Sequence, residues 1–223
     1  MTDHQAFALR GKKVSILGDS YSTFAGCVPE NCYVFYPLDI LPDVARAEDT
    51  WWHQLITRTG MWLLSNNSSS GTTICTSVRP EHCVEDAFVC RMKHSLSRNG
   101  IQGETPDLIL IFGGTNDSWT DAPLGRLQYE NWTEKDLQAV LPAFCDLLHY
   151  VTAENPHAFV LNIINTDMKP EIVQGMREAC AHYSVHCLAL REIDKAYGHP
   201  TKLGMTQIAD QTEDALNKLF SCE

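Results

Sequence analysis

The sequence has no cluster of basic residues. Its 17 Lys and Arg residues are scattered and are outnumbered by 28 Asp and Glu residues, which gives a formal net charge of -11. Proteins that bind nucleic acid present a basic stripe to the phosphate backbone. We therefore expect no nucleic acid partner, and the acidity disfavours an anionic membrane surface while it aids solubility.

Long apolar runs and paired cysteine motifs are also absent from the sequence. No window approaches 18 consecutive apolar residues, and the first residues lack the basic and then apolar segments of a secretory signal. The nine cysteines, an odd number, include no Cys-x-x-Cys pair of the zinc or redox type. We expect reduced packing thiols, no metal, no membrane and a cytoplasmic location, although a chain with its signal removed would look the same.

Nothing in the sequence marks a domain boundary. There is no low-complexity run and no linker rich in Pro, Gly or Ser. With 223 residues, 44% of them apolar, the chain is long enough for one sizeable core. We predict a single domain over residues 1–223.

Short apolar runs alternate with helical patterns along the chain. The runs have the composition of strands buried in a parallel sheet, and they lie at residues 13–17, 107–112 and 158–164, with weaker candidates at 62–66 and 186–190. Apolar residues recur at three- and four-residue steps in 137–151, 172–183 and from Thr201 onward. Pro170 suits a first helical residue, whereas Pro142 requires its helix to begin late or to kink. The alternation predicts an open parallel sheet with helices on both faces and ligands at the carboxyl ends of the strands.

Residues 25–49 break this alternation. Three prolines and several aromatic residues there fit neither a helix nor a strand. We call this segment the proline loop. Long ordered loops of this kind serve as binding loops or as simple covering flaps, and the sequence leaves both open.

The tripeptide Gly18-Asp19-Ser20 leaves the first predicted strand. A nucleophilic serine needs a tight turn that lifts its hydroxyl out of the core, with backbone N–H groups free to receive an oxyanion. By itself the tripeptide indicates little, because Asp and Ser close turns or cap helices more often than they take part in catalysis.

Three further residues support a catalytic role for the tripeptide. Gly71 follows the second predicted strand and offers a backbone N–H, and Asn116 stands in a turn after the third strand, where its amide can donate to an oxyanion. His199 precedes Pro200 and the last helix, so its imidazole lies at a turn and can serve as a base for Ser20.

In these four blocks the chain resembles the SGNH or GDSL hydrolases, whose motifs supply in order a Ser, a Gly, an Asn and a His. The resemblance spans residues 14 to 204, with Gly204 in the last block. It implies a flavodoxin-like three-layer α/β/α sandwich with a mostly five-stranded parallel sheet, hydrolysis of esters or thioesters, and no metal or organic cofactor. Around Ser15 to Ser20, Thr50 to Trp52 and Asn66 to Gly71, the chain looks like a bacterial branch whose substrates are mostly unassigned.

The fourth block departs from the family pattern. The family places an Asp three residues before the His, where its carboxylate holds the imidazole, but this chain has Ala196 there. Either Asp194 reaches the imidazole through a lengthened loop, or a backbone carbonyl orients His199 and the site is a Ser-His dyad.

The resulting hypothesis is an esterase in which Ser20 attacks, His199 takes its proton, and Ser20, Gly71 and Asn116 bind the oxyanion. The substrate would be a small ester, with an acetylated carbohydrate as one candidate, and Trp119 is the aromatic residue placed to line its cleft. The alternative is a ligand-binding module of the same fold with weakened catalysis, which the missing carboxylate would suit. His182 and His186 have a zinc spacing, but a helix end and a strand start are predicted to separate them.

Overall fold

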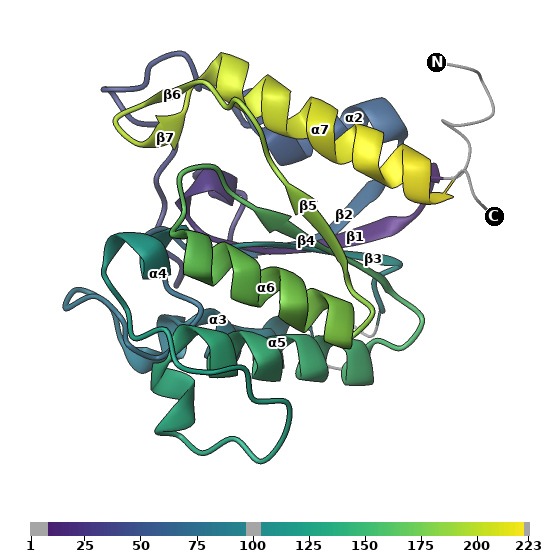
Figure 1. The fold of residues 1–223 in the computed structure, drawn as a ribbon. Helices are drawn as coiled ribbons and strands as arrows, with labels where there is room; N and C mark the ends of the chain where they lie inside the picture. The colour runs from purple at the N-terminus through teal and green to yellow at the C-terminus, as the bar shows by residue number, and fades with distance from the viewer. Residues whose placement is uncertain (1–8, 97–103, 221–223) are drawn as a thin grey trace.

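The computed structural model describes residues 9–96 and 104–220 (Figure 1). Five parallel strands form one sheet in the order β2-β1-β3-β4-β5. Their bounds are Lys13–Gly18 for β1, Trp62–Ser68 for β2, Leu108–Phe112 for β3, Phe159–Ile164 for β4 and His186–Ala189 for β5. All five predicted strands are confirmed, each within two residues at its ends.

Helices cover both faces of the sheet. In Figure 1, α2 and α7 lie above it, and α3, α5 and α6 lie below. The helices are α2 Trp51–Thr59, α3 Phe88–Ser95, α4 Thr115–Trp119, α5 Val140–Glu154, α6 Pro170–His182 and α7 Lys202–Phe220. Short 3-10 turns occur at Ser20–Ser22, Ala47–Asp49, Val84–Asp86 and Asp136–Gln138. The three layers confirm the predicted α/β/α sandwich, whereas the single domain stays a prediction.

The central strand β3 shows why the runs predicted strands. Its side chains alternate between two cores, because successive residues of a strand point to opposite faces. Leu108 and Leu110 pack in the core beneath α2 and α7, and Ile109 and Ile111 pack in the core against α3, α5 and α6. A strand buried on both faces therefore has no polar positions.

The structure shows where the helices with Pro142 and Pro170 begin and where β2 ends. Pro170 is the first residue of α6, as predicted, and α5 begins at Val140, so Pro142 lies in the first turn, where its missing N–H costs no hydrogen bond. The predicted strand at 62–66 extends two residues further, so that Asn67 lies in β2 opposite Leu17. A parallel ladder is made by the backbone and continues under polar side chains.

The state of the cysteines, membrane-spanning helices and metal-binding clusters can be described for residues 9–96 and 104–220. The eight cysteines in 9–96 and 104–220 are free thiols, and Cys222 lies outside those ranges. Within the same ranges, no helix is long and apolar enough to cross a membrane, and no group of His, Cys, Asp or Glu side chains could hold a metal. His182 ends α6 and His186 begins β5.

Candidate active site

Ser20 lies directly after β1, at the point where the strand order changes direction between β2 and β3. Ligands of open α/β sheets bind at this switch point, outside the carboxyl ends of the strands. The Asp19 carboxylate accepts the N–H of Tyr21 at 3.1 Å and caps the turn that carries Ser20. Ser20 is buried, and only 3% of its surface is exposed. Asp19 therefore fixes the turn, and burial raises the pKa of its carboxyl to about 7.

His199 reaches Ser20 from a β-hairpin that the sequence did not predict. The hairpin pairs β6 Lys195–Ala196 with β7 His199–Pro200, and its two loop residues, Tyr197 and Gly198, have positive φ angles of 52° and 78°. Two such residues are typical of a tight hairpin turn. His199 Nε2 lies 2.9 Å from Ser20 Oγ, which is hydrogen-bond distance. Figure 1 shows the hairpin and α4 at the same end of the sheet.

The hairpin places an alanine at the position where the family pattern has its carboxylate. Ala196 lies directly opposite His199 across the two strands, and its methyl group cannot accept a hydrogen bond. The other imidazole nitrogen, Nδ1, lies 3.2 Å from the backbone oxygen of Tyr197.

Asp194 has other partners. Its carboxylate accepts the hydroxyl of Thr201, its N–H donates to Gln207 Oε1 at 2.7 Å, and its backbone oxygen accepts the N–H of Thr201 at 3.1 Å. These bonds attach the segment before the hairpin to the start of α7. Among the described residues, the hydrogen bonds of His199 go to Ser20 and Tyr197.

Gly71 and Asn116 lie beside the Ser20 turn. Gly71 has a φ of 78°, and a Cβ atom there would lie 2.5 Å from His82 Nε2, so a larger residue would not fit. Asn116 donates one amide hydrogen to the backbone oxygen of Thr72 at 3.0 Å, and its Oδ1 accepts from Arg79 at 3.1 Å. Arg79 thereby fixes the direction of the amide.

Arg91, which no sequence pattern singles out, joins the first two blocks. Its buried guanidinium donates to the backbone oxygen of Gly18 and to Thr72 Oγ1, both at 3.1 Å, and to Asn67 Oδ1 at 2.8 Å. Asp117 similarly accepts the N–H of Ile74 at 2.8 Å. No sequence signal distinguishes such a buried arginine from a solvated one, because its partners come from distant segments.

Aromatic and basic side chains surround the imidazole. Burial lowers the pKa of His199 below 6.5, the carbonyl of Tyr197 raises it, and the charges of Lys195 and Arg79 lower it further. The ring of Trp119 lies edge-on at 5.9 Å from that of His199 and is 44% exposed. The sequence selected Trp119 for the cleft, and the structure places it at the rim of the Ser20–His199 pair.

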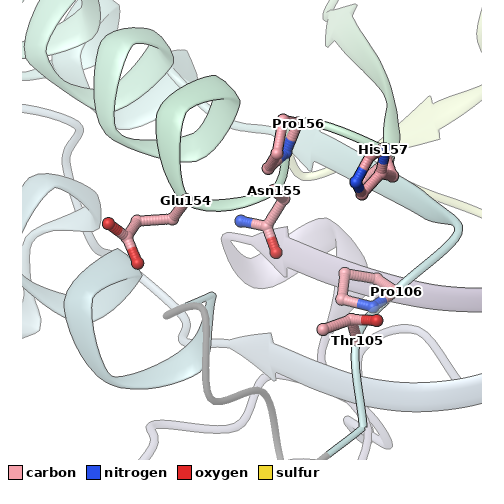
Figure 2. A pocket seen from close by; sticks show the side chains of 7 residues that line it. Thr105, Pro106, Glu154, Asn155, Pro156 and His157 are labelled. Atoms are coloured by element: carbon pink, nitrogen blue, oxygen red, sulfur yellow. The ribbon is translucent and has the colours of Figure 1, made fainter.

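A separate pocket lies at the other end of the sheet. Figure 2 shows it at the amino-terminal ends of β3 and β4, lined by Thr105, Pro106, Glu154, Asn155, Pro156, His157 and Ala158. It is remote from Ser20 and takes no part in the arrangement above.

Comparisons with known proteins identify the family of this chain. Residues 12–216 match the family model for GDSL-like lipase/acylhydrolase. A crystal structure from Bacteroides ovatus, described only as a GDSL-like lipase, is 37% identical with a TM-score of 0.85 and covers 93% of this chain and 99% of its own. One from Bacteroides uniformis with the same description is 41% identical with a TM-score of 0.84 and covers 92% and 95%.

More distant structures share the fold alone. A family two carbohydrate esterase from Clostridium thermocellum, solved in complex with cellohexaose, is 16% identical with a TM-score of 0.61 and covers 93% of this chain and 64% of its own. A comparison with curated proteins gives no significant match. The family model and the two Bacteroides structures confirm the resemblance found in the four blocks, and this chain is an esterase that belongs to the GDSL-like lipase/acylhydrolase family.

Proposed function

We propose that this protein hydrolyses small esters by acyl transfer through a Ser20–His199 dyad. The observation that carries the proposal is the 2.9 Å contact between Ser20 Oγ and His199 Nε2. His199 takes the hydroxyl proton as Ser20 Oγ attacks the ester carbonyl, and it then returns that proton to the departing alcohol. Water attacks the acyl-enzyme in the same way, with His199 again as base, and releases the acid and free Ser20.

The oxyanion of each tetrahedral intermediate would be held by the N–H groups of Ser20 and Gly71 and by Asn116 Nδ2. Among the backbone hydrogen bonds of turns, loops and helix caps in residues 9–96 and 104–220, none has the N–H of Ser20 or of Gly71 as its donor. The amide of Asn116 is held in place at both ends by Thr72 and Arg79. Donors that are fixed before the charge develops stabilise the transition state without reorganisation.

The orienting group of the base is, in this proposal, the backbone oxygen of Tyr197. It is the group found at His199 Nδ1, whereas the Asp194 carboxylate binds Thr201. The Tyr197 oxygen belongs to the same hairpin turn as the base, so it fixes the tautomer without a carboxylate.

Replacing Asp194 by asparagine tests this assignment. We expect kcat/KM for an aryl acetate to stay within about threefold of the parent, because an asparagine oxygen still accepts from Thr201. A carboxylate that oriented the base would lower kcat by about 10⁴-fold when replaced in this way, as it does in the serine protease triad. Melting temperatures of both proteins are measured alongside, and a loss of that size with an unchanged melting temperature would restore Asp194 as the third member.

The pH dependence gives a second test of the dyad. Only the neutral imidazole accepts a proton, so kcat/KM rises with pH as His199 loses its proton. Because burial lowers the pKa of His199, we expect the midpoint of this rise below pH 6.5. The rate of Ser20 labelling by a fluorophosphonate, followed from pH 4.5 to 8.5, should show the same midpoint. A midpoint above 6.5 in both would indicate a carboxylate partner instead.

The substrate proposed for this site is a small acyl ester, and an acetylated carbohydrate suits its rim. Trp119 and Tyr197, 44% and 76% exposed, offer aromatic faces on which a sugar ring can stack. The carbohydrate esterase from Clostridium thermocellum, which shares the fold, was solved with cellohexaose. Rates on acetylated sugars, aryl acetates and thioesters, measured side by side, test this choice.

A cytoplasmic location stays a prediction.

The missing carboxylate at position 196 also suits a binding module with weakened catalysis. Labelling separates the two functions, because only an activated serine reacts rapidly with a fluorophosphonate. Mass spectrometry should find the label on Ser20. An unlabelled protein that still binds acetylated sugars would be a binding module.

A further inference from the structure

The imidazole of His199 is enclosed by three aromatic rings, and Phe35 is the nearest. The two ring centroids lie 3.6 Å apart, and the ring planes differ by 10°, so the rings are stacked face to face. Tyr21 lies at 5.4 Å with an angle of 50°, and Trp119 lies at 5.9 Å with an angle of 72°. Of these three rings, only Phe35 is parallel to the imidazole and covers its face.

Phe35 belongs to the proline loop, which is attached to the serine turn. The N–H of Phe35 donates to Thr23 Oγ1 at 2.9 Å. The same hydroxyl donates to the backbone oxygen of Ser20 at 3.1 Å. One side chain thus connects the nucleophile to the residue whose ring covers the base.

The proline loop is attached to the base as well. Tyr36 is fully buried, and its hydroxyl donates to the backbone oxygen of Pro200 at 2.8 Å. The backbone oxygen of Tyr36 accepts the N–H of Ala25 at 2.8 Å, which closes the loop on itself. Phe35 is therefore held from the nucleophile side and from the base side.

The Phe35 ring can do two things for His199 that the backbone carbonyl of Tyr197 cannot. The Tyr197 oxygen binds Nδ1 of His199, but the contact of Nε2 with Ser20 Oγ is given up when Ser20 attacks the substrate, so a single hydrogen bond is then left to resist rotation of the ring. A carbonyl is also neutral, whereas a triad carboxylate stabilises the imidazolium that forms during the reaction. A stacked ring blocks the rotation by contact, and the negative face of its π system attracts a cation.

We propose that Phe35 is a positioning residue that replaces the triad carboxylate: its ring holds the His199 imidazole with Nε2 toward Ser20 and stabilises the imidazolium through its π face. The inference rests on the proposed dyad and gives the proline loop a role in the reaction. It requires an aromatic ring at position 35.

Paired substitutions at position 35 test this requirement. We expect Phe35→Leu, which keeps an apolar side chain of similar size, to lower kcat by about 30-fold with less than a threefold change in KM, because the imidazole loses its fixed plane. Phe35→Tyr keeps the stacked ring and should stay within about threefold of the parent. Val34→Ala, an exposed neighbour in the same loop, is the control for general effects on the loop and should leave both constants unchanged.

The pH dependence of kcat/KM is a second test, because a purely structural role of Phe35 would leave its acid midpoint unchanged. The titratable groups that face His199 are Lys195, Arg79 and Tyr21, and burial is the largest cause of its low pKa. Phe35→Leu keeps this face of the imidazole covered but removes the π system that stabilises the imidazolium, so the acid midpoint of kcat/KM should fall below the parent value. In Phe35→Tyr the midpoint should stay at the parent value.

Failure of this inference is distinguishable from failure of the dyad. If the parent neither hydrolyses aryl acetates nor labels at Ser20, the dyad is wrong. If the parent is active and folded Phe35→Leu matches it, or if Phe35→Leu and Phe35→Tyr lose activity equally, Phe35 has no positioning role. Circular dichroism and melting temperature establish that each variant is folded.

Discussion

Replacing Ser20 by alanine is expected to lower kcat/KM for a small aryl acetate by about 10⁴-fold or more, since Ser20 is the one nucleophile that contacts His199 among residues 9–96 and 104–220. The side-chain oxygen of Ser20 has one hydrogen bond in the structure, to the imidazole, so its loss should shift the free energy of unfolding by only about 1 kcal/mol. Initial rates and calorimetry measure the two effects. Full activity in the Ser20→Ala protein would overturn the assignment.

Ser22 offers a matched control on the same turn. Its hydroxyl accepts the indole N–H of the buried Trp51 at 3.2 Å and does not contact His199. Ser22→Ala leaves that buried N–H without its partner, at a cost of about 1–3 kcal/mol in stability. The two substitutions should therefore have different effects: Ser20→Ala should lose activity, and Ser22→Ala should lose stability.

Replacing Gly204 by alanine is expected to damage both stability and activity. A Cβ atom there would lie 2.1 Å from the backbone oxygen of Asp194 and 3.1 Å from Pro200 Cβ. Backbone atoms cannot swing aside, so α7 and the segment that carries His199 must separate. We expect a loss of about 2 kcal/mol or more in stability, even after the gain in helix propensity. A displacement of the imidazole by about 1 Å would lower kcat by about 100-fold.

Gly175 is the matched control for this substitution. It also lies within a helix, α6, and its added Cβ would meet Leu141 Cδ2 at 2.4 Å. That contact is with the flexible end of a side chain in the core on the other face of the sheet, and it can be relieved by rotation. Gly175→Ala should leave kcat unchanged and alter stability by about 1 kcal/mol or less. Equal losses of kcat in both variants would show that the contact with the His199 segment is not what matters.

In the proposed dyad the base is held without a carboxylate. The imidazole would be held by the Tyr197 carbonyl, by the packing of α7 against the hairpin, and in our inference by Phe35. Burial lowers the pKa of His199, which favours the neutral form that acts as a base.

The sequence by itself determined the fold class and the order of the four blocks. The strands were visible because strands buried on both faces, such as β3, are mostly apolar, and the helices because their apolar residues recur at the helical period. Ser20, Gly71, Asn116 and His199 were proposed as site residues because each follows the end of a predicted element, where a parallel sheet gathers its ligand groups.

Only the tertiary structure decided what surrounds the base. Asp194 was selected because it is near His199 in the chain, but the hairpin directs its carboxylate to Thr201. Phe35 contacts the imidazole across more than 160 residues of chain, and Arg91 joins two turns that the sequence holds far apart. Ring stacking and buried hydrogen bonds depend on distances in space, and no period or local spacing in the sequence encodes them.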